Sequence, residues 1–338
     1  MKHRLFFPMS LLAAMLLFGL ASCEVEFSPN AEWKNVPVVY CVLDQDDDTS
    51  WVRVERCYLS NDGVFSYGNL SDSINYDSAA ISVALLAYEG DILRDSMAFE
   101  YMLRLRDSGS FAHGMQPIYG CETRGRLKEN YTYFLNIRNA DGTLLATTKP
   151  VSLIRQISNT VITDPSNVHG FKFSDINNGS DANCKIAWNN LENARIYQPV
   201  VRFYYGVDTE TRYVDVKCPQ VPASPRYSTG SLFYQRALFL DDLKKHLLAD
   251  TASRKEYLMR VDLYLTCCTE DLNTYMSTTA LGNIAIEQNH QVYTNIIGGI
   301  GIFAARRTHI YKSIPADDSL IKDRGLYWFL RNLGVGIY

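Results

Sequence analysis

Residues 131–148, YTYFLNIRNADGTLLATT, decide the class of fold. Apolar and polar side chains alternate along the first part of this stretch, and a second β-prone run follows the Asp141-Gly142 pair. Such alternation is typical of a strand with one buried face, and Asp-Gly favours the tight turn of a β-hairpin. The stretch therefore predicts two antiparallel strands.

The sequence before this hairpin contains more strand patterns. Residues 36–42 and 51–56 are predicted strands on either side of an acidic turn, and residues 80–88 form a strand that we expect to be buried on both faces. Glu89-Gly90-Asp91 favours another hairpin turn. Short strands separated by turn signals are typical of a β-sandwich. We therefore expect a mainly β protein in which residues 36–154 form an N-terminal sandwich of immunoglobulin type.

The second half of the chain also shows strand patterns. Residues 150–165 form a predicted crossover, and strands are predicted at 185–188, 197–206 and 212–216. Their order resembles the opening of a fibronectin type III domain, with Trp188 as the core tryptophan. We therefore expect residues 155–338 to form a C-terminal β-sandwich of fibronectin III type.

Two short helices are expected within this second domain. Leucines recur at helical spacing over residues 240–247, and Asp241 and Asp242 precede two lysines, which is the order that the helix dipole favours at a helix start. A second helical pattern follows Thr269, which we expect to cap the helix. Residues 257–265 alternate as a strand between the two helices.

Composition excludes several classes of protein. The chain has 338 residues, of which 47% are hydrophobic and 21% charged, so it is able to bury a sizeable core. The 22 tyrosines and 15 phenylalanines suit pleated sheets. The formal net charge of −4 and the lack of a basic stripe with interleaved aromatics argue against nucleic acid as a partner.

The N-terminal residues indicate export and lipidation. Lys2 and Arg4 precede an apolar run over residues 5–20, which is shorter than the roughly 20 residues of a membrane-spanning helix. The run ends in Leu20-Ala21-Ser22-Cys23, which has the pattern of a lipobox. We expect residues 1–22 to be a signal peptide, Cys23 to be acylated and residues 23–35 to tether the protein to the membrane. The alternative is an ordinary secretory signal with a coincidental cysteine.

Seven cysteines remain after Cys23, so at least one thiol stays unpaired within the chain. Cys41 and Cys57 lie in strand-like runs and are expected to be buried free thiols. Cys267 and Cys268 are adjacent, and a vicinal disulfide is open to them, although neighbours on a strand point to opposite faces.

One acidic stretch has the spacing of a calcium loop. Asp44, Asp46, Asp48 and Glu55 fall at positions 1, 3, 5 and 12, but Thr49 stands where the sharp turn needs glycine. The flanking residues are predicted strands rather than helices. We therefore favour a solvated acidic turn over a calcium site, and we expect no bound metal or cofactor.

The sequence offers no catalytic motif. The glycine-rich residues 295–303 do not match a phosphate-binding loop, because no helical pattern follows them. Glycines among Ile and Phe instead favour a bulged strand or a close approach of two backbones in a core. The histidines are scattered and form no metal-binding or nucleophilic pattern. We expect a non-catalytic protein. An unrecognised hydrolase ranks third among the hypotheses for function, behind the two given below.

Five short stretches resemble the Asp-Ser/Thr-aliphatic acceptor of a bacterial O-glycosylation system, and five polar turns are the alternative interpretation. The acceptors would be Ser73, Ser78, Ser96, Thr251 and Ser319.

Three stretches together resemble a Bacteroidetes-type lipoprotein family known as domain of unknown function 4249. They are VVYCVLD at 38–44 followed by VRV at 52–54, TEDLNTY at 269–275, and YTNIIGGIGIF at 293–303. The closing stretch departs from the family in Ile297, where a polar residue is common. The resemblance implies an outer-membrane lipoprotein, often encoded near TonB-dependent transporters, and it implies no catalytic residue.

These observations predict a surface-exposed outer-membrane lipoprotein that acts as an accessory partner in TonB-dependent nutrient uptake. The polar loop at 61–78 is the candidate contact surface, with Phe65 and Tyr67 as its aromatic anchors. The alternative for this loop is that it contacts nothing. A structural part of a surface fibre or adhesin is the second hypothesis for function, and it would require an exchangeable strand.

Overall fold

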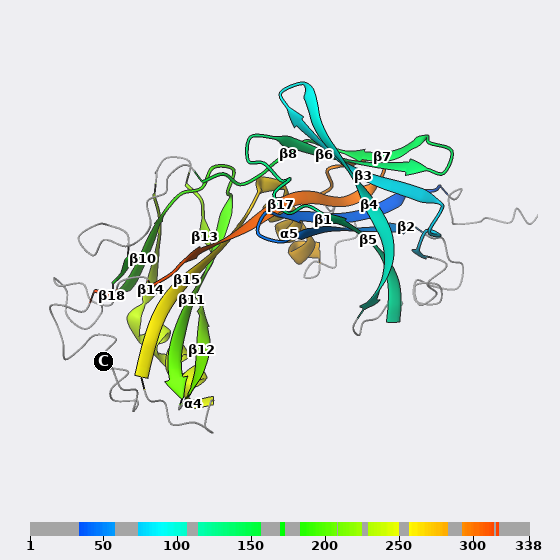
Figure 1. Cartoon of the computed structure of the whole chain (residues 1–338). Helices are drawn as coiled ribbons and strands as arrows, with labels where there is room; N and C mark the ends of the chain where they lie inside the picture. The colour runs from blue at the N-terminus through cyan, green and yellow to red at the C-terminus, as the bar shows by residue number, and fades with distance from the viewer. Residues whose placement is uncertain are drawn as a thin grey trace, which may run out of the picture.

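The structure is a computed structural model, and it is mainly β, as predicted (Figure 1). It describes residues 34–57, 74–106, 114–156, 170–172, 183–207, 209–224, 229–249, 257–282, 293–313 and 316–317.

The first half of the chain contributes strands only. They are β1 (Pro37–Asp44), β2 (Thr49–Arg56), β3 (Ile81–Glu89), β4 (Ile92–Arg106), β5 (Gly114–Glu122), β6 (Thr132–Asn139), β7 (Leu144–Thr148) and β8 (Val151–Ser152).

The second half contributes further strands and two helices. They are β9 (Gly170–Lys172), β10 (Asn183–Asn189), β11 (Ile196–Val207), β12 (Glu210–Lys217), β13 (Val221–Pro222), β14 (Thr229–Gln235), α4 (Arg236–Ala249), β15 (Tyr257–Cys268), α5 (Glu270–Gly282), β16 (Ile296–Ile297), β17 (Ile300–Tyr311) and β18 (Ala316–Asp317).

Most of the strands belong to one large mixed sheet. Its order is β12-β11-β15-β17-β1-β2-β5-β4-β3-β6-β7-β16, with β13 beside β11 and β8 beside β6. A second sheet has the order β14-β10-β9-β18. The large sheet turns at β4, because the first part of this long strand pairs with β3 and the second part pairs with β5.

Both predicted hairpin turns are confirmed. Strands β6 and β7 pair across Asp141-Gly142, and β3 and β4 pair across Gly90. Gly142 and Gly90 have φ angles of 83° and 59°, in the left-handed region that glycine adopts without steric cost. The carboxylate of Asp141 also accepts a hydrogen bond of 2.9 Å from the backbone N–H of Thr143, as turn aspartates often do.

Strand β3 is buried on one face only, so the expectation of burial on both faces is wrong. Ile81, Val83 and Leu85 are buried, whereas Ser82 is exposed and Leu86 is half-buried. The reason is that the strand packs against other elements on its inner side, while its outer side forms part of the molecular surface. Because residues 83–87 are all apolar, the sequence does not show which of them face the core and which face outward.

Most of the buried hydrophobic side chains of the described residues belong to two clusters. The first core joins β1–β8 with β16 and the first part of β17, and its largest members include Leu43, Leu85, Tyr133 and Phe303. The second core joins both sheets with α4, and it contains Trp188, as predicted. Trp188 is fully buried, and its ring lies 5.3 Å from that of Tyr197.

Strand β17 links the two cores. Residues 300–306 run parallel to β1, and residues 306–311 run antiparallel to β15. Its Phe303 is buried in the first core and its Tyr311 in the second. Figure 1 shows the strand passing from one half of the molecule to the other.

Of the two predicted alternatives for the glycine-rich segment, the structure shows the close approach of two backbones. A Cβ atom on Gly299 would lie 2.6 Å from the carbonyl oxygen of Pro37, and one on Gly301 would collide with the carbonyl of Val39. Gly301 also has a φ of 117°, which side chains rarely tolerate. The buried Asn295 donates from Nδ2 to Phe303 O at 2.6 Å, and its Oδ1 accepts from Phe303 N at 2.9 Å.

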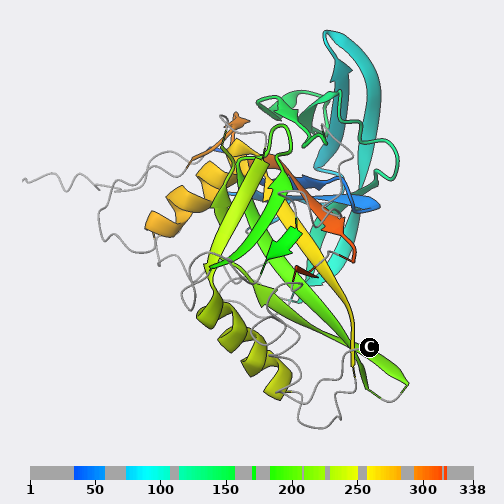
Figure 2. The same ribbon diagram turned by 90° about the vertical axis from the view of Figure 1, so that its left-hand side faces the viewer.

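Helix α4 begins earlier than predicted. It starts at Arg236, so Asp241 and Asp242 lie in its middle, and its first turn contains no acidic residue. The reason is Phe239, which is fully buried against Phe203 in the second core and adds a turn to the apolar stripe. Figure 2 shows α4 and α5 as two separate helices.

Helix α5 begins directly after Thr269, as predicted, but the expected side-chain cap is wrong. The Thr269 hydroxyl bonds to the backbone N and O of Ala305 on β17, at 3.3 Å each. It therefore fastens the start of the helix to the sheet.

Among the described residues, no helix is both long and apolar enough to cross a membrane.

Candidate binding surface

The acidic turn between β1 and β2 is bound to β17 by two of its carboxylates. Asp44 is buried and forms an ion pair of 2.6 Å with Arg306, and the Asp46 carboxylate accepts a hydrogen bond of 2.8 Å from the N–H of Thr308. The interpretation of Asp44 as part of a solvated turn is therefore wrong, because its carboxylate joins two neighbouring strands that are far apart in the sequence.

The four carboxylates of the calcium pattern do not converge. Asp48 is paired with Arg124, and Glu55 lies 3.0 Å from Arg53. Each side chain therefore has a cation or a backbone donor of its own. Within the described ranges, no three His, Cys, Asp or Glu side chains are grouped in a way that would hold a metal ion.

Six cysteines in the described part of the chain are free thiols, namely Cys41, Cys57, Cys121, Cys218, Cys267 and Cys268. Cys41, Cys267 and Cys268 are buried, and Cys57 is half-buried. The prediction of a buried free thiol is confirmed for Cys41 and is wrong for Cys57, which is only half-buried. Cys267 and Cys268 form no disulfide with each other, and burial raises the pKa of the Cys267 thiol to about 12.

Several predicted site residues lie outside the described ranges. They are Cys23, Phe65, Tyr67, Ser73, Thr251 and Ser319. Of the predicted glycosylation acceptors, Ser78 lies exposed in the turn before β3, and Ser96 lies exposed on β4. The neighbouring Asp95 is paired with Arg126 at 2.7 Å.

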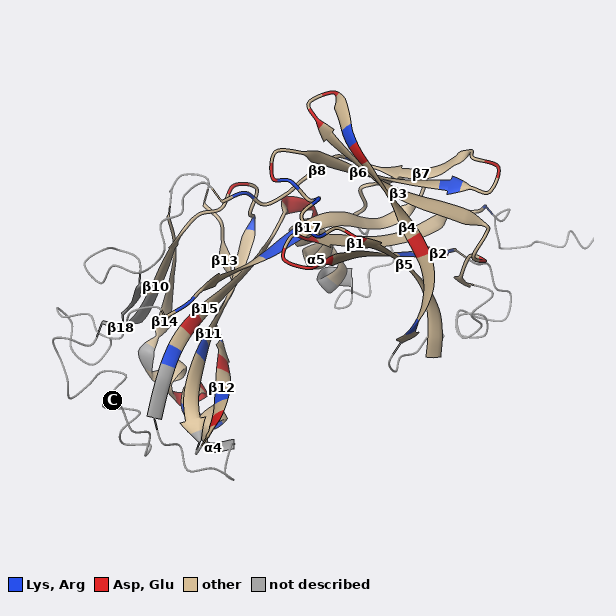
Figure 3. Ribbon diagram, viewed as in Figure 1, with Lys and Arg blue, Asp and Glu red and all other residues tan. Residues whose placement is uncertain are grey.

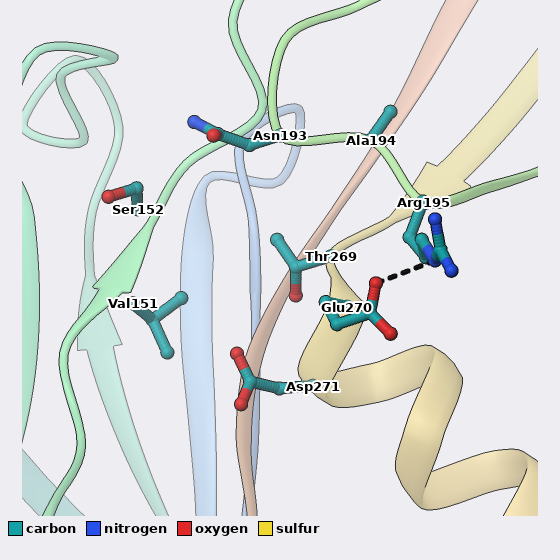
Figure 4. A pocket seen from close by; sticks show the side chains of 8 residues that line it. All are labelled: Val151, Ser152, Asn193, Ala194, Arg195, Thr269, Glu270 and Asp271. Carbon is teal, nitrogen blue, oxygen red and sulfur yellow. Dashed lines mark ion pairs between the residues drawn. The ribbon is translucent and has the colours of Figure 1, made fainter. Parts of the chain in front are cut away.

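A cavity of about 340 Å³ lies where β8, the start of β11 and the start of α5 meet (Figure 4). Its lining residues are Val151, Ser152, Asn193, Ala194, Arg195, Thr269, Glu270 and Asp271. Glu270 forms an ion pair of 2.6 Å with Arg195, drawn as a dashed line in Figure 4. Asp271 accepts a hydrogen bond of 2.5 Å from the Tyr293 hydroxyl. Both carboxylates are therefore engaged in fastening α5 to its neighbours.

A second feature stands on the outer face of the large sheet, in the half that holds α4. We call it the arginine–tyrosine surface, and it consists of Arg202 and Tyr204 on β11, Tyr213 and Asp215 on β12, and Arg260, Asp262 and Tyr264 on β15.

Strand register places these side chains on one face. Arg202 pairs with Asp215 on one side and with Asp262 on the other. Tyr204 in the same way lies between Tyr213 and Arg260. Directly paired residues of antiparallel strands share a face, so the group forms a continuous patch. The charged segments on β11, β12 and β15 in Figure 3 mark its position.

Arg202 is the centre of the patch. Its guanidinium binds the Asp215 carboxylate with two hydrogen bonds, of 2.7 and 2.8 Å. Its carbon lies 3.9 Å from the Tyr213 ring centroid and 4.3 Å from that of Tyr264, so the guanidinium is stacked between two aromatic rings. The hydrogen bonds to Asp215 raise the pKa of Arg202, which fixes its positive charge.

A second stacked pair extends the patch. The Arg260 guanidinium carbon lies 4.2 Å above the Tyr204 ring, and its Nε lies 2.9 Å from the fully buried Asp262. The hydroxyls of Tyr204 and Tyr264 share a hydrogen bond of 3.1 Å. These contacts fix the orientation of the aromatic rings before any partner binds.

The outermost ring of the patch is available to a partner. The side chain of Tyr213 is 54% exposed, although it is packed against Arg202 and lies 5.9 Å from the Tyr204 ring. Tyrosine and arginine are the residues that protein interfaces favour, because they offer large contact areas and polar groups together. A rigid arrangement also reduces the entropy lost on binding.

Sequence reasoning did not find this surface, although a signal for it exists. Arg202 and Tyr204 alternate along one predicted strand, and Arg260, Asp262 and Tyr264 alternate along another. Alternation places each set on one face of its own strand. Only the pairing of β11 with β12 and β15 brings the sets together.

In comparisons with known proteins, no family model and no curated protein matches the chain. The stretches at 38–44, 269–275 and 293–303 meet in space. Residues 38–44 lie in β1, which pairs with β17, and α5 starts at Glu270, directly after Thr269, whose hydroxyl bonds to Ala305 on β17. The ring of Tyr40 on β1 lies 6.4 Å from that of Tyr275 on α5.

Proposed function

We propose that this protein is a surface-exposed outer-membrane lipoprotein that binds a TonB-dependent transporter as a non-catalytic accessory partner in nutrient uptake. The lipobox at Cys23 supports the localisation in the outer membrane. The resemblance of three stretches to the lipoprotein family supports the role as an accessory partner in uptake. The proposal includes membership of that family, whose characteristic stretches in this chain form one contact between β1, β17 and α5.

The arginine–tyrosine surface is the observation that carries the binding role. It presents an exposed tyrosine on a patch whose arginines and carboxylates are already paired, so a partner meets a preorganised aromatic surface. Strand β17 pairs with β1 along its first part and with β15 along its last part. The chain enters β1 at the end remote from β15, so the patch lies far from the point where the predicted tether joins the body.

We further propose that each core belongs to a β-sandwich, of immunoglobulin type in the first half and fibronectin III type in the second. In the second core, residues of the small sheet pack against β11, β12 and β15. In the first core, residues of β1 and β2 pack with those of β3 and β6. The expected boundary at residues 154 and 155 stays a prediction. Strand β16 and the start of β17 come after it in sequence but pack in the first core.

The proposal is tested by a crosslinked pull-down from native membranes with matched variants. Tyr213→Ala should lower the recovered transporter at least about tenfold, as expected for an interface hot spot. Phe233→Ala is the control, because Phe233 is 60% exposed but lies on β14 in the other sheet. Both variants should remain folded, which their melting temperatures show.

Three results would count against this function. Recovery of no transporter, or of a fibre subunit in its place, would refute the uptake role. Equal losses in Tyr213→Ala and Phe233→Ala would remove the arginine–tyrosine surface from the proposal. Cys23→Ala should release the protein from the membrane fraction or stall its processing, and an unacylated mature N-terminus in the parent, measured by mass spectrometry, would refute the anchor.

A further inference from the structure

We propose that the last part of β4 and the start of β5 touch the lipid surface to which the protein is anchored, and that their exposed Leu103, Leu105 and Met115 enter the lipid interface. This inference rests on the lipid anchor of the proposed function. It adds a second membrane contact and an orientation of the body on the membrane.

The three side chains form one apolar patch. Leu105 on β4 pairs with Met115 on β5, and Leu103 lies two residues before Leu105 on the same face. Exposure increases from the core toward the end of β4 and the start of β5. Tyr119 is buried in the first core, whereas Leu103 is 51%, Met115 56% and Leu105 72% exposed. The apolar face of the core therefore continues beyond the core into solvent.

Strand register places this patch at the end of the sheet where the chain arrives from the tether. Pro37 at the start of β1 pairs with Arg56 at the end of β2. Strand β5 runs antiparallel to β2, with Thr49 opposite Glu122 and Val52 opposite Tyr119. The start of β5, with Met115, consequently lies toward the same end as Pro37.

The length of the tether limits how far this end can stand from the membrane. Residues 23–35 reach at most about 45 Å even when fully extended. The start of β5 lies toward the same end of the sheet as Pro37, so the patch lies near the point where the tether joins the body. A membrane is also present wherever the anchored protein is present.

The chemistry of the patch suits lipid better than a protein partner. Its members are aliphatic side chains and a thioether, without an aromatic ring or charge among them. Leucine is under-represented at protein hot spots, where tyrosine, tryptophan and arginine dominate. The chain thus separates an aliphatic patch near the anchor from the arginine–tyrosine surface at the far end. Apolar area at an interface contributes membrane affinity in proportion to the area buried.

The test uses the full mature chain with Cys23→Ser, so that no acyl group contributes to binding. Cosedimentation with vesicles of phosphatidylethanolamine and phosphatidylglycerol should recover this protein with the lipid. The triple variant Leu103→Ser, Leu105→Ser and Met115→Ser should partition at least about tenfold more weakly. The control variant is Ile92→Ser with Leu93→Ser, two similarly exposed apolar residues at the β3–β4 turn, and it should bind vesicles like the parent.

Equal vesicle binding by the triple variant and the parent, or no vesicle binding by either, would overturn the lipid contact. A triple variant that binds vesicles normally but no longer recovers the transporter would show that the patch contacts protein instead. The vesicle experiment contains no transporter and no acyl chain. A failed pull-down or an unacylated Cys23 would therefore refute the proposed function but would not decide whether the patch binds lipid. The melting temperatures show that each variant is folded.

Discussion

Replacement of Gly301 by alanine should destabilise the protein far more than the same change at Gly142. Both glycines have positive φ angles, of 117° and 83°, so alanine meets backbone strain of about 1–3 kcal/mol at either site. They differ in the space around them. A Cβ on Gly142 would have no atom within 4 Å, whereas one on Gly301 would overlap the Val39 backbone of β1.

The overlap at Gly301 adds a second cost. Backbone atoms cannot turn aside as a flexible side chain does, so β1 must shift along the stretch where it pairs with β17. Val39 is fully buried in the first core, and overpacking at such sites costs about 1–3 kcal/mol. Together with the strain, we expect Gly301→Ala to lower the free energy of unfolding by about 4 kcal/mol.

Urea unfolding followed by tryptophan fluorescence measures this difference on the mature chain with Cys23→Ser. The midpoint of Gly301→Ala should fall well below that of Gly142→Ala, with similar slopes for the two variants. Stabilities that agree within about 0.5 kcal/mol would refute the reasoning, because the contact between β1 and β17 would then leave room for a side chain.

Three further predictions follow from buried polar groups. Asn295→Ala should lower the unfolding free energy by about 2–4 kcal/mol in the same assay, because both backbone groups of Phe303 lose their partner; a loss below about 0.5 kcal/mol would contradict this bridge. Iodoacetamide at pH 8 should label Cys57 before Cys267, because burial raises the pKa of both thiols but Cys57 is only half-buried; mass spectrometry of labelled peptides shows the order, and equal rates would be inconsistent with it. Burial and the charge of Arg307 lower the pKa of His309, so the unfolded state binds its proton more readily. The contribution of neutral His309 to the free energy of unfolding should therefore be fully present above about pH 6.5 and be lost as the pH falls below it. The dependence of stability on pH in this range should be weaker in His309→Gln.

Local patterns in the sequence predicted the local elements. The hairpin turns at Gly90 and Gly142 follow from φ angles that glycine adopts freely, and the β3 and β6 strands follow from β-prone residues nearby. The start of α4 was missed because Phe239 acts through the second core rather than through its neighbours in sequence. An apolar residue stabilises a helix mainly when the fold buries it against another element.

The sequence by itself therefore determined the class of fold, the turns and the glycine-rich close approach, since each depends on the conformational preferences of a few adjacent residues. Only the tertiary structure decided which distant groups meet. Asp44 binds Arg306 because β1 lies parallel to β17, and Arg202 is stacked between Tyr213 and Tyr264 because β11 lies between β12 and β15. Such pairings depend on strand order and register, which are set by the packing of both cores as a whole and leave no mark within any single stretch of the chain.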